Sequence, residues 1–265
     1  MADARGGFLW KHADMTTTLI LASVLSGAFI GAVLGFIGAG GAMITVPILL
    51  YIFDFTPLQA TTAALAVVFL AAISSLLPKF KSGDVLVKEA LTIWSLGLVT
   101  NIGLGSIADS IPDSIILIGF SAVLIGAGLS MLRAPIKDHP EKKIPFIYLV
   151  LLSLVIGSLT GLFGIGGGFL AIPILVLFFH TPQNKAAGTS LLIIALNCAT
   201  AFLAKIKFWS DIDWHYPLII GITSILIAQI ASALAPKAPT VHLKRGFALL
   251  LFAIAGFTII SNLLS

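Results

Sequence analysis

A glycine-rich block within a long apolar run occurs twice in this chain, at an offset of 126 residues. The first copy runs from Gly35 to Pro47 and the second from Gly161 to Pro173, and both contain Gly-x-x-Gly-x-Gly-Gly. Glycine weakens helix interiors and permits backbone conformations that other residues avoid, so each block predicts a broken helix. In hydrocarbon, such a break is tolerated only where it is buried in protein or lines a wet cavity.

Composition places the chain in a membrane. Of its 265 residues 58% are hydrophobic and only 10% are charged, and the mean hydropathy is +1.11, whereas a soluble domain carries about 25% charged residues. The apolar runs show no period of two, which favours helices over a β-barrel. The net charge of +4 comes from short basic clusters between apolar runs, a pattern typical of cytoplasmic loops. We therefore expect no nucleic acid partner.

The repeat extends over the whole chain, which indicates gene duplication. Beyond the basic loop after the third apolar run the offset becomes 127, so that Asp84 matches Asp211 and Pro112 matches Pro239. The sequence predicts an N-terminal tail over 1–14, a first transmembrane repeat over 15–132, a basic cytoplasmic linker over 133–145 and a second transmembrane repeat over 146–265.

Each repeat is predicted to contain four spanning helices and one short helix that follows the glycine break. The short runs, 42–53 and 169–179, have the length of a re-entrant or half-membrane helix. If they re-enter, the chain has eight spans, and the basic loops and both termini lie inside. If they cross, ten elements form two inverted five-helix repeats, and Lys205 and Lys207 lie outside. Within the first span, Gly27, Gly31 and Gly35 mark a face that a neighbouring helix can approach closely.

An enzyme embedded in the membrane would need a nucleophile with a base, or a metal cluster, within the apolar runs. The five histidines instead lie at loops or span ends without metal-ligand spacing, and the glycine blocks do not read as P-loops. Asp211, Asp213 and His215 are expected to form a solvated cluster, and Cys198 is expected to be a packing residue. The sequence therefore predicts neither an enzyme nor a cofactor or metal site.

Uncharged polar groups remain as candidates for binding. A helix that restarts after a break points free N–H groups and its positive dipole end at the gap, which gives an anion site without a fixed charge. Two such ends are expected to converge near the midplane. The third apolar run of each half, Leu58–Leu77 and Lys185–Ala204, is expected to add hydroxyl donors. The predicted substrate-binding residues are Gly38, Gly40, Gly41, Thr61, Thr62, Gly164, Gly166, Gly167, Thr189, Ser190 and Asn197, with Asn101, Lys205 and Gln229 as accessory residues. The alternative is that the glycines allow packing and the hydroxyls bond to their own helices.

The two blocks, together with the motif from Gly188 to Leu191, resemble the signature of the TauE/SafE sulfite exporter family, also called the toluene-sulfonate uptake permease family. The first half departs from this pattern, with Ala42 in place of Gly168 and Thr62-Ala63-Ala64-Leu65 in place of the second motif. The resemblance implies a secondary transporter of sulfite, organosulfonates such as sulfoacetate, or related sulfur compounds.

We therefore predict an exporter of a small sulfur-containing oxyanion that works by alternating access, in the cell membrane of a prokaryote. Neither half contains an ATP-binding motif, so a gradient must supply the energy, and a proton is the candidate coupling ion. A channel-like anion pore, a transporter of thiosulfate or a carboxylate, and a membrane enzyme or assembly subunit are the alternatives. Small-residue faces also leave open a homodimer.

Overall fold

The computed structural model describes residues 4–132, 145–164, 171–172, 175–176, 180–237 and 240–264. These residues form helices and turns without a strand. The helices are α1 (Ala4–Ile37), α2 (Gly41–Tyr51), α3 (Pro57–Lys81), α4 (Val87–Ile107), α5 (Asp113–Leu132), α6 (Phe146–Phe163), α8 (Gln183–Ala204), α9 (His215–Leu234) and α10 (Thr240–Leu264), with short 3-10 turns η1 (Ala108–Ser110), η2 (Ile206–Asp211) and η3 (Ala235–Lys237).

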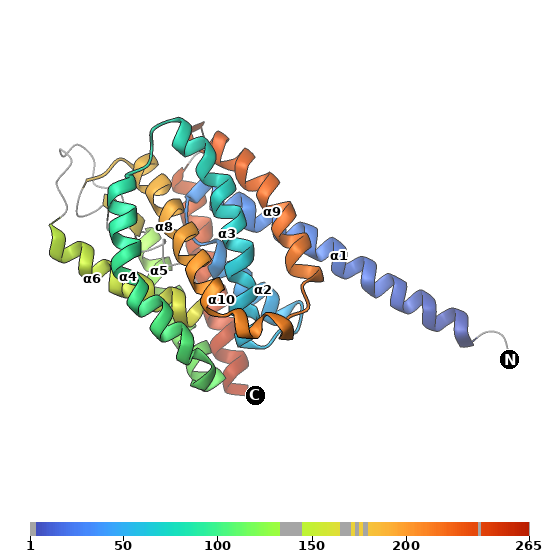
Figure 1. Cartoon of the computed structure of the whole chain (residues 1–265). Helices are drawn as coiled ribbons and strands as arrows, with labels where there is room; N and C mark the ends of the chain where they lie inside the picture. The colour runs from blue at the N-terminus through green and yellow to red at the C-terminus, as the bar shows by residue number, and fades with distance from the viewer. Residues whose placement is uncertain are drawn as a thin grey trace.

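Seven of the described helices are long and apolar enough to cross a membrane, while α2 and the apolar part of α10 are shorter. The prediction of a multi-span, all-helical membrane protein is confirmed. Helix α1 begins at Ala4, before the span predicted from Met15, and Figure 1 shows this part projecting from the bundle towards the N-terminus. The linker over 133–144 and most of the second short helix, predicted over 169–179, lie outside the described residues.

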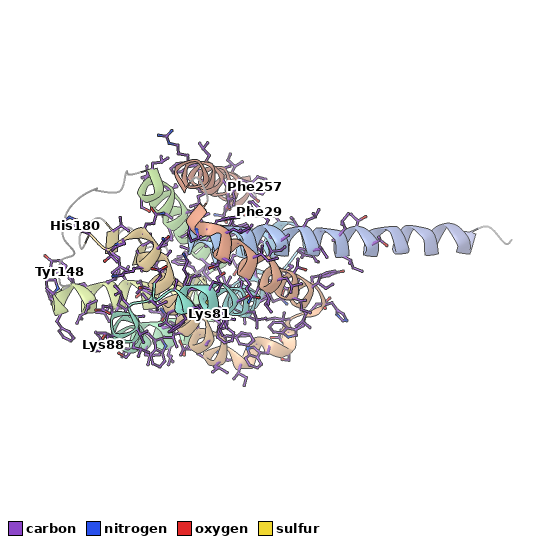
Figure 2. All side chains as sticks on the ribbon, turned by 90° about the horizontal axis from the view of Figure 1, so that it is seen from above. Phe29, Lys81, Lys88, Tyr148, His180 and Phe257 are labelled. Carbon is purple, nitrogen blue, oxygen red and sulfur yellow. The ribbon has the colours of Figure 1, made fainter. Side chains whose placement is uncertain are left out.

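Helices α3 and α8 form the centre of the bundle (Figure 1). In their apolar windows 72% and 67% of the residues are buried, compared with 28% in α4 and 39% in both α6 and α9. The outer helices expose large apolar side chains; Figure 2 labels Phe29, Tyr148 and Phe257, which are 45%, 56% and 56% exposed. Such surfaces suit hydrocarbon, so the outer helices face lipid and shield α3 and α8 from it.

Small residues let two pairs of helices pack backbone to backbone. A Cβ on Gly27 would lie 2.5 Å from the Ile220 carbonyl oxygen of α9, and one on Gly35 would lie 2.5 Å from the Cβ of Ala231. The predicted close approach along this face of α1 is therefore confirmed. On the other side of the molecule, Gly157 and Gly161 of α6 pack in the same way against the α4 backbone.

Helices α3 and α8 run antiparallel, as two contacts between their ends show. The side chain of Gln59, in the first turn of α3, donates from Nε2 to the Asp211 carbonyl oxygen beyond the end of α8, at 2.6 Å. The Leu86 N–H, beyond the end of α3, donates to Thr189 Oγ1 in the second turn of α8, at 3.0 Å. Each central helix therefore begins where the other ends.

Candidate functional site

The first glycine break has the backbone conformation that its sequence predicts. Gly38 and Gly40 adopt φ values of 78° and 88°, a left-handed region that side chains disfavour. Helix α2 then starts at Gly41, which is buried, and no side chain caps Gly40. Most of α2 is buried as well, so the positive end of its dipole lies inside protein, where an anion would be stabilised.

The second break repeats this geometry as far as it is described. Gly164 ends α6 with φ 66°, and its N–H donates to the Thr160 carbonyl oxygen at 3.0 Å. Gly166 and Gly167, which the sequence assigns to the same site, lie outside the described residues.

Each break packs against the first turns of a central helix. A Cβ on Gly38 would lie 2.6 Å from the Cβ of Ala187 in α8, and one on Gly164 would lie 2.6 Å from the Thr61 carbonyl oxygen in α3. Because α3 and α8 run antiparallel, Gly38 and Gly164 lie towards opposite ends of this pair. The expected convergence of the two breaks near the midplane is therefore not observed for these two glycines.

The predicted hydroxyl donors already bond to carbonyl groups of their own helices. Thr61 and Thr62 both donate to the Leu58 carbonyl oxygen, at 3.0 and 2.7 Å, and Thr189 donates to the Lys185 carbonyl oxygen at 2.7 Å. Ser190, which follows Thr189 in the sequence, is also fully buried. The threonine hydroxyls can still accept a hydrogen bond, but donating to an anion would require them to break an existing one.

Two of the predicted amides meet in a polar cluster between α4 and α8. Asn101 and Asn197 are fully buried, and Asn101 Nδ2 donates to Asn197 Oδ1 at 3.2 Å and to Thr200 Oγ1 at 3.0 Å. Thr200 was not among the predicted residues, although it lies one turn after Asn197, on the same helix face. Gln229, by contrast, is exposed on α9 and is not brought to this cluster.

The buried charged side chains of the described chain are two lysines at corresponding positions of the repeat. Lys79 lies in the last turn of α3 and is 3% exposed, and Lys205 follows the last residue of α8 and is fully buried. Lys205 was predicted as an accessory residue and Lys79 was not. Because the two helices are antiparallel, one buried lysine lies at each end of the central pair.

The exposed acidic and histidine cluster and the lone cysteine lie as the sequence predicts. Asp213 and His215 form an exposed pair, with Nδ1 and Oδ1 2.7 Å apart, and Cys198 is buried. Among the described residues there is no group of three or more acidic, histidine or cysteine side chains that could hold a metal ion.

Buried helix breaks, flanked by central helices and shielded from lipid by an outer layer, are features of membrane transporters. The family model described as Sulfite exporter TauE/SafE matches residues 23–258. The chain belongs to this family of transmembrane transporters.

Similar proteins from bacteria and archaea carry the same general name. A "Probable membrane transporter protein" of Methanocaldococcus jannaschii is 33% identical over 223 residues, covering 80% of this chain and 81% of that protein. One from Xylella fastidiosa strain 9a5c is 28% identical over 253 residues, covering 92% and 97%. YunE of Bacillus subtilis is 29% identical over 227 residues, covering 74% and 81%. These names are those of transporters and not of enzymes.

Proposed function

We propose that this protein is a secondary transporter that exports sulfite or a small organosulfonate across the cell membrane by alternating access. The observation that carries the proposal is the pair of matched glycine breaks, each packed against the first turns of a central helix. The family to which the chain belongs is described by sulfite export, which supports a sulfur oxyanion as the substrate class.

The anion is bound by backbone N–H groups at the broken helix ends. Helix α2 begins inside protein at Gly40 and Gly41, without a side-chain cap. The hydroxyl of Thr189, two residues after the Ala187 that Gly38 contacts, is engaged within its own helix. N–H groups at a buried helix start stabilise an anion through both hydrogen bonds and the dipole. The sequence assigns Gly164, Gly166 and Gly167 to the corresponding site in the second half.

Two buried lysines support an anionic substrate. Lys79 and Lys205 place a basic side chain at each end of the α3–α8 pair, and each carries a positive charge when it is protonated. Charge in a low-dielectric wall raises the local concentration of oppositely charged ions. An anion is therefore attracted from either side of the membrane, as a two-way access path requires.

Of the two arrangements that the sequence leaves open, the contacts favour inverted repeats. Helices α3 and α8 are the corresponding third runs of the two halves, and they are antiparallel, as an axis in the membrane plane requires. With ten crossings, four of the fifteen basic residues lie outside, namely Arg5, Lys11, Lys205 and Lys207. The remaining basic residues lie on the cytoplasmic side, in agreement with the positive-inside rule. Inverted halves can rock about their interface and expose one break at a time.

Binding is the first test of this function. The protein purified in detergent would be heated with sulfite, thiosulfate, sulfate, sulfoacetate or taurine, with chloride as the control. A ligand that binds only the folded state raises the melting temperature by mass action. We expect a shift with sulfite or sulfoacetate and none with chloride. If every anion gave the same small shift, specific oxyanion binding would be refuted.

Transport is tested in liposomes that contain only this protein. Preloaded unlabelled sulfite should accelerate the entry of labelled sulfite, because a carrier returns faster when it is loaded. A channel-like pore would show neither saturation nor counterflow. An enzyme or an assembly subunit would move no sulfite. Comparing rates with and without an imposed proton gradient tests the proton as the coupling ion.

A further inference from the structure

The amide pair between α4 and α8 has a defined orientation. Asn101 Nδ2 faces three acceptors, namely the Asn197 carbonyl oxygen at 3.1 Å, Asn197 Oδ1 at 3.2 Å and Thr200 Oγ1 at 3.0 Å. Exchanging the nitrogen and oxygen of either side chain would bring like atoms together, so this network fixes both assignments.

This orientation leaves one acceptor and one donor unused. Asn101 Oδ1 and Asn197 Nδ2 have no hydrogen-bond partner among the described residues, and both side chains are fully buried. Buried polar groups in native proteins are nearly always paired, so an unpaired couple calls for an explanation. Because the two amides are hydrogen-bonded to each other, the free oxygen and the free N–H belong to a single small cluster.

The cluster lies beside the second glycine break. The Asn101 carbonyl oxygen is the nearest atom to a Cβ built on Gly161, and Gly161 precedes Gly164 by one turn of helix. Asn101 thus packs against α6 one helical turn before Gly164, the part of the second break that the structure describes.

The corresponding place in the first half shows that packing does not require these amides. By the repeat offsets, Asn101 corresponds to Ala228 of α9 and Asn197 corresponds to Ala71 of α3, both of which are fully buried. Gly35 packs against the Ala228 carbonyl oxygen, as Gly161 does against that of Asn101. The same helix contact therefore forms with alanine at both positions.

We propose that Asn101 and Asn197 bind the hydroxyl-bearing, singly charged form of the transported oxyanion between α4 and α8, about one helical turn from Gly164. Asn197 Nδ2 donates to an oxygen of the anion, and Asn101 Oδ1 accepts the hydrogen bond from its O–H group. A fully ionised oxyanion has no proton to donate and would place lone pairs against Asn101 Oδ1, which disfavours it. The pair therefore selects hydrogen sulfite over the sulfite dianion. This inference rests on the proposed function and adds the protonation state of the substrate.

The test uses sulfite as the probe and measures its dissociation constant with purified protein at mildly acidic and mildly alkaline pH. In the wild type, affinity for total sulfite should fall with rising pH in step with the monoanion fraction. Asn101→Ala should weaken binding about tenfold at acidic pH, as the loss of one hydrogen bond to a charged group predicts, and should flatten the pH dependence. Asn197→Ala removes the donor and should weaken binding at both pH values.

Two further variants keep the test decisive. The double variant Asn101→Ala/Asn197→Ala reproduces the alanine pair of the first half and should therefore fold. Ser74→Ala is the control: it alters the first-half position that corresponds to Thr200 and should leave sulfite binding unchanged. If Asn101→Ala leaves the affinity and its pH dependence intact, the pair holds only water or serves packing, and the proposal is wrong. Equal weakening at both pH values by Asn101→Ala also overturns it. If the wild type binds no sulfite and moves none in liposomes, it is the proposed function that fails, and this assignment fails with it.

Discussion

The two glycine breaks have similar backbone conformations where they are described, but the side chains on the neighbouring helices differ. Gly38 and Gly164 both have positive φ and both pack against the first turns of a central helix. One turn before Gly38, the neighbouring outer helix presents Ala228; one turn before Gly164, it presents Asn101. The positive φ and the close packing of Gly38 and Gly164 thus occur in both halves of the chain, whereas the buried amides occur in only one, so the backbone contact does not depend on the amides.

The helix contacts around the first break are also fully satisfied. Ser74 Oγ donates to the Ile225 carbonyl oxygen and Ser232 Oγ donates to the Ser75 carbonyl oxygen, both at 2.6 Å. These bonds tie α3 to α9, and among the described residues the buried serine hydroxyls of this contact all have a partner. The contact between α4 and α8, by contrast, retains an N–H and an oxygen that have no partner in the described part of the chain. The serine hydroxyls satisfy the α3–α9 contact, whereas the α4–α8 contact can still form hydrogen bonds with a ligand.

The largest effect is expected from filling the backbone contacts that both sides share. Gly161→Leu would drive a side chain into the Asn101 carbonyl group, and Gly35→Leu would drive one into α9. Neither backbone can retreat without separating a helix pair, so each variant should lose more than about 3 kcal/mol of stability and yield little folded protein. The yield of monodisperse protein in detergent measures this.

The matched control for that prediction is Gly103→Leu. Gly103 lies on the exposed face of α4, and a Cβ there meets nothing within 4 Å. This variant should be recovered like the wild type. Good yields of both Gly35→Leu and Gly161→Leu would show that the two contacts are looser than the structure indicates.

A smaller loss is expected at the breaks themselves. Alanine at Gly38 or Gly164 must adopt a left-handed conformation, which costs about 1–2 kcal/mol, and its Cβ would also press on Ala187 or Thr61. Gly83 also has a positive φ, 72°, but a Cβ there meets nothing within 4 Å. Gly83→Ala therefore measures the cost of the left-handed conformation alone. Melting temperatures in detergent should rank Gly83→Ala above both break variants. Similar values for all three would mean that the breaks are not tightly packed.

Much of the fold could be predicted from the sequence, because its strongest signals are local. Long apolar runs mark the helices, and the glycines spaced four apart along α1 mark its close contact. Thr56 and Gln59 form the capping box that starts α3, with Pro57 at the first helical position. The positive φ of Gly38 and Gly164 likewise follows from the glycine blocks themselves.

The candidate site was harder to predict, because helices that are apolar all round do not reveal which face is inside. Gln229 and Asn101 look alike in sequence, yet Gln229 is exposed and Asn101 is fully buried. The pairing of Asn101 with Asn197 and Thr200 depends on the register of α4 against α8, which no local pattern encodes. The positions of the two breaks, similarly, follow from the antiparallel packing of α3 and α8.

A double-mutant cycle on Asn101 and Asn197 should show whether the α4–α8 contact remains stable with alanine at both positions, as in the α3–α9 contact. Asn101→Ala leaves both polar atoms of the Asn197 amide without a side-chain partner in the described chain, and such a loss costs about 1–3 kcal/mol. Removing both amides eliminates the buried polar atoms, so the double variant should be more stable than Asn101→Ala alone. Thermal unfolding in the absence of substrate measures each corner of the cycle. Strict additivity of the two losses would indicate that the amides do not interact.

The smallest effect is expected in the two loops that follow the central helices α3 and α8. The loop after α3 is held by Ser82, which donates to Asp84, whereas the loop after α8 holds the exposed pair of Asp213 and His215. Hydrogen bonds from the His215 side chain and N–H keep the pKa of Asp213 below its usual value. A carboxylate whose folded-state pKa is depressed stabilises the protein above its unfolded pKa of about 3.9, and this stabilisation is lost as the pH falls through the folded value.

Asp213→Asn should therefore lower stability at neutral pH by less than about 1 kcal/mol, since both side chains are exposed and solvent screens their attraction. At a pH below the folded-state pKa of Asp213, variant and wild type should melt at the same temperature. Melting curves at neutral and strongly acidic pH measure the difference. If Asp213→Asn lost as much stability at neutral pH as Gly164→Ala, the exposed Asp213–His215 pair would contribute as much to stability as the buried contact of Gly164 with α3. That result would contradict the small contribution expected of an exposed pair.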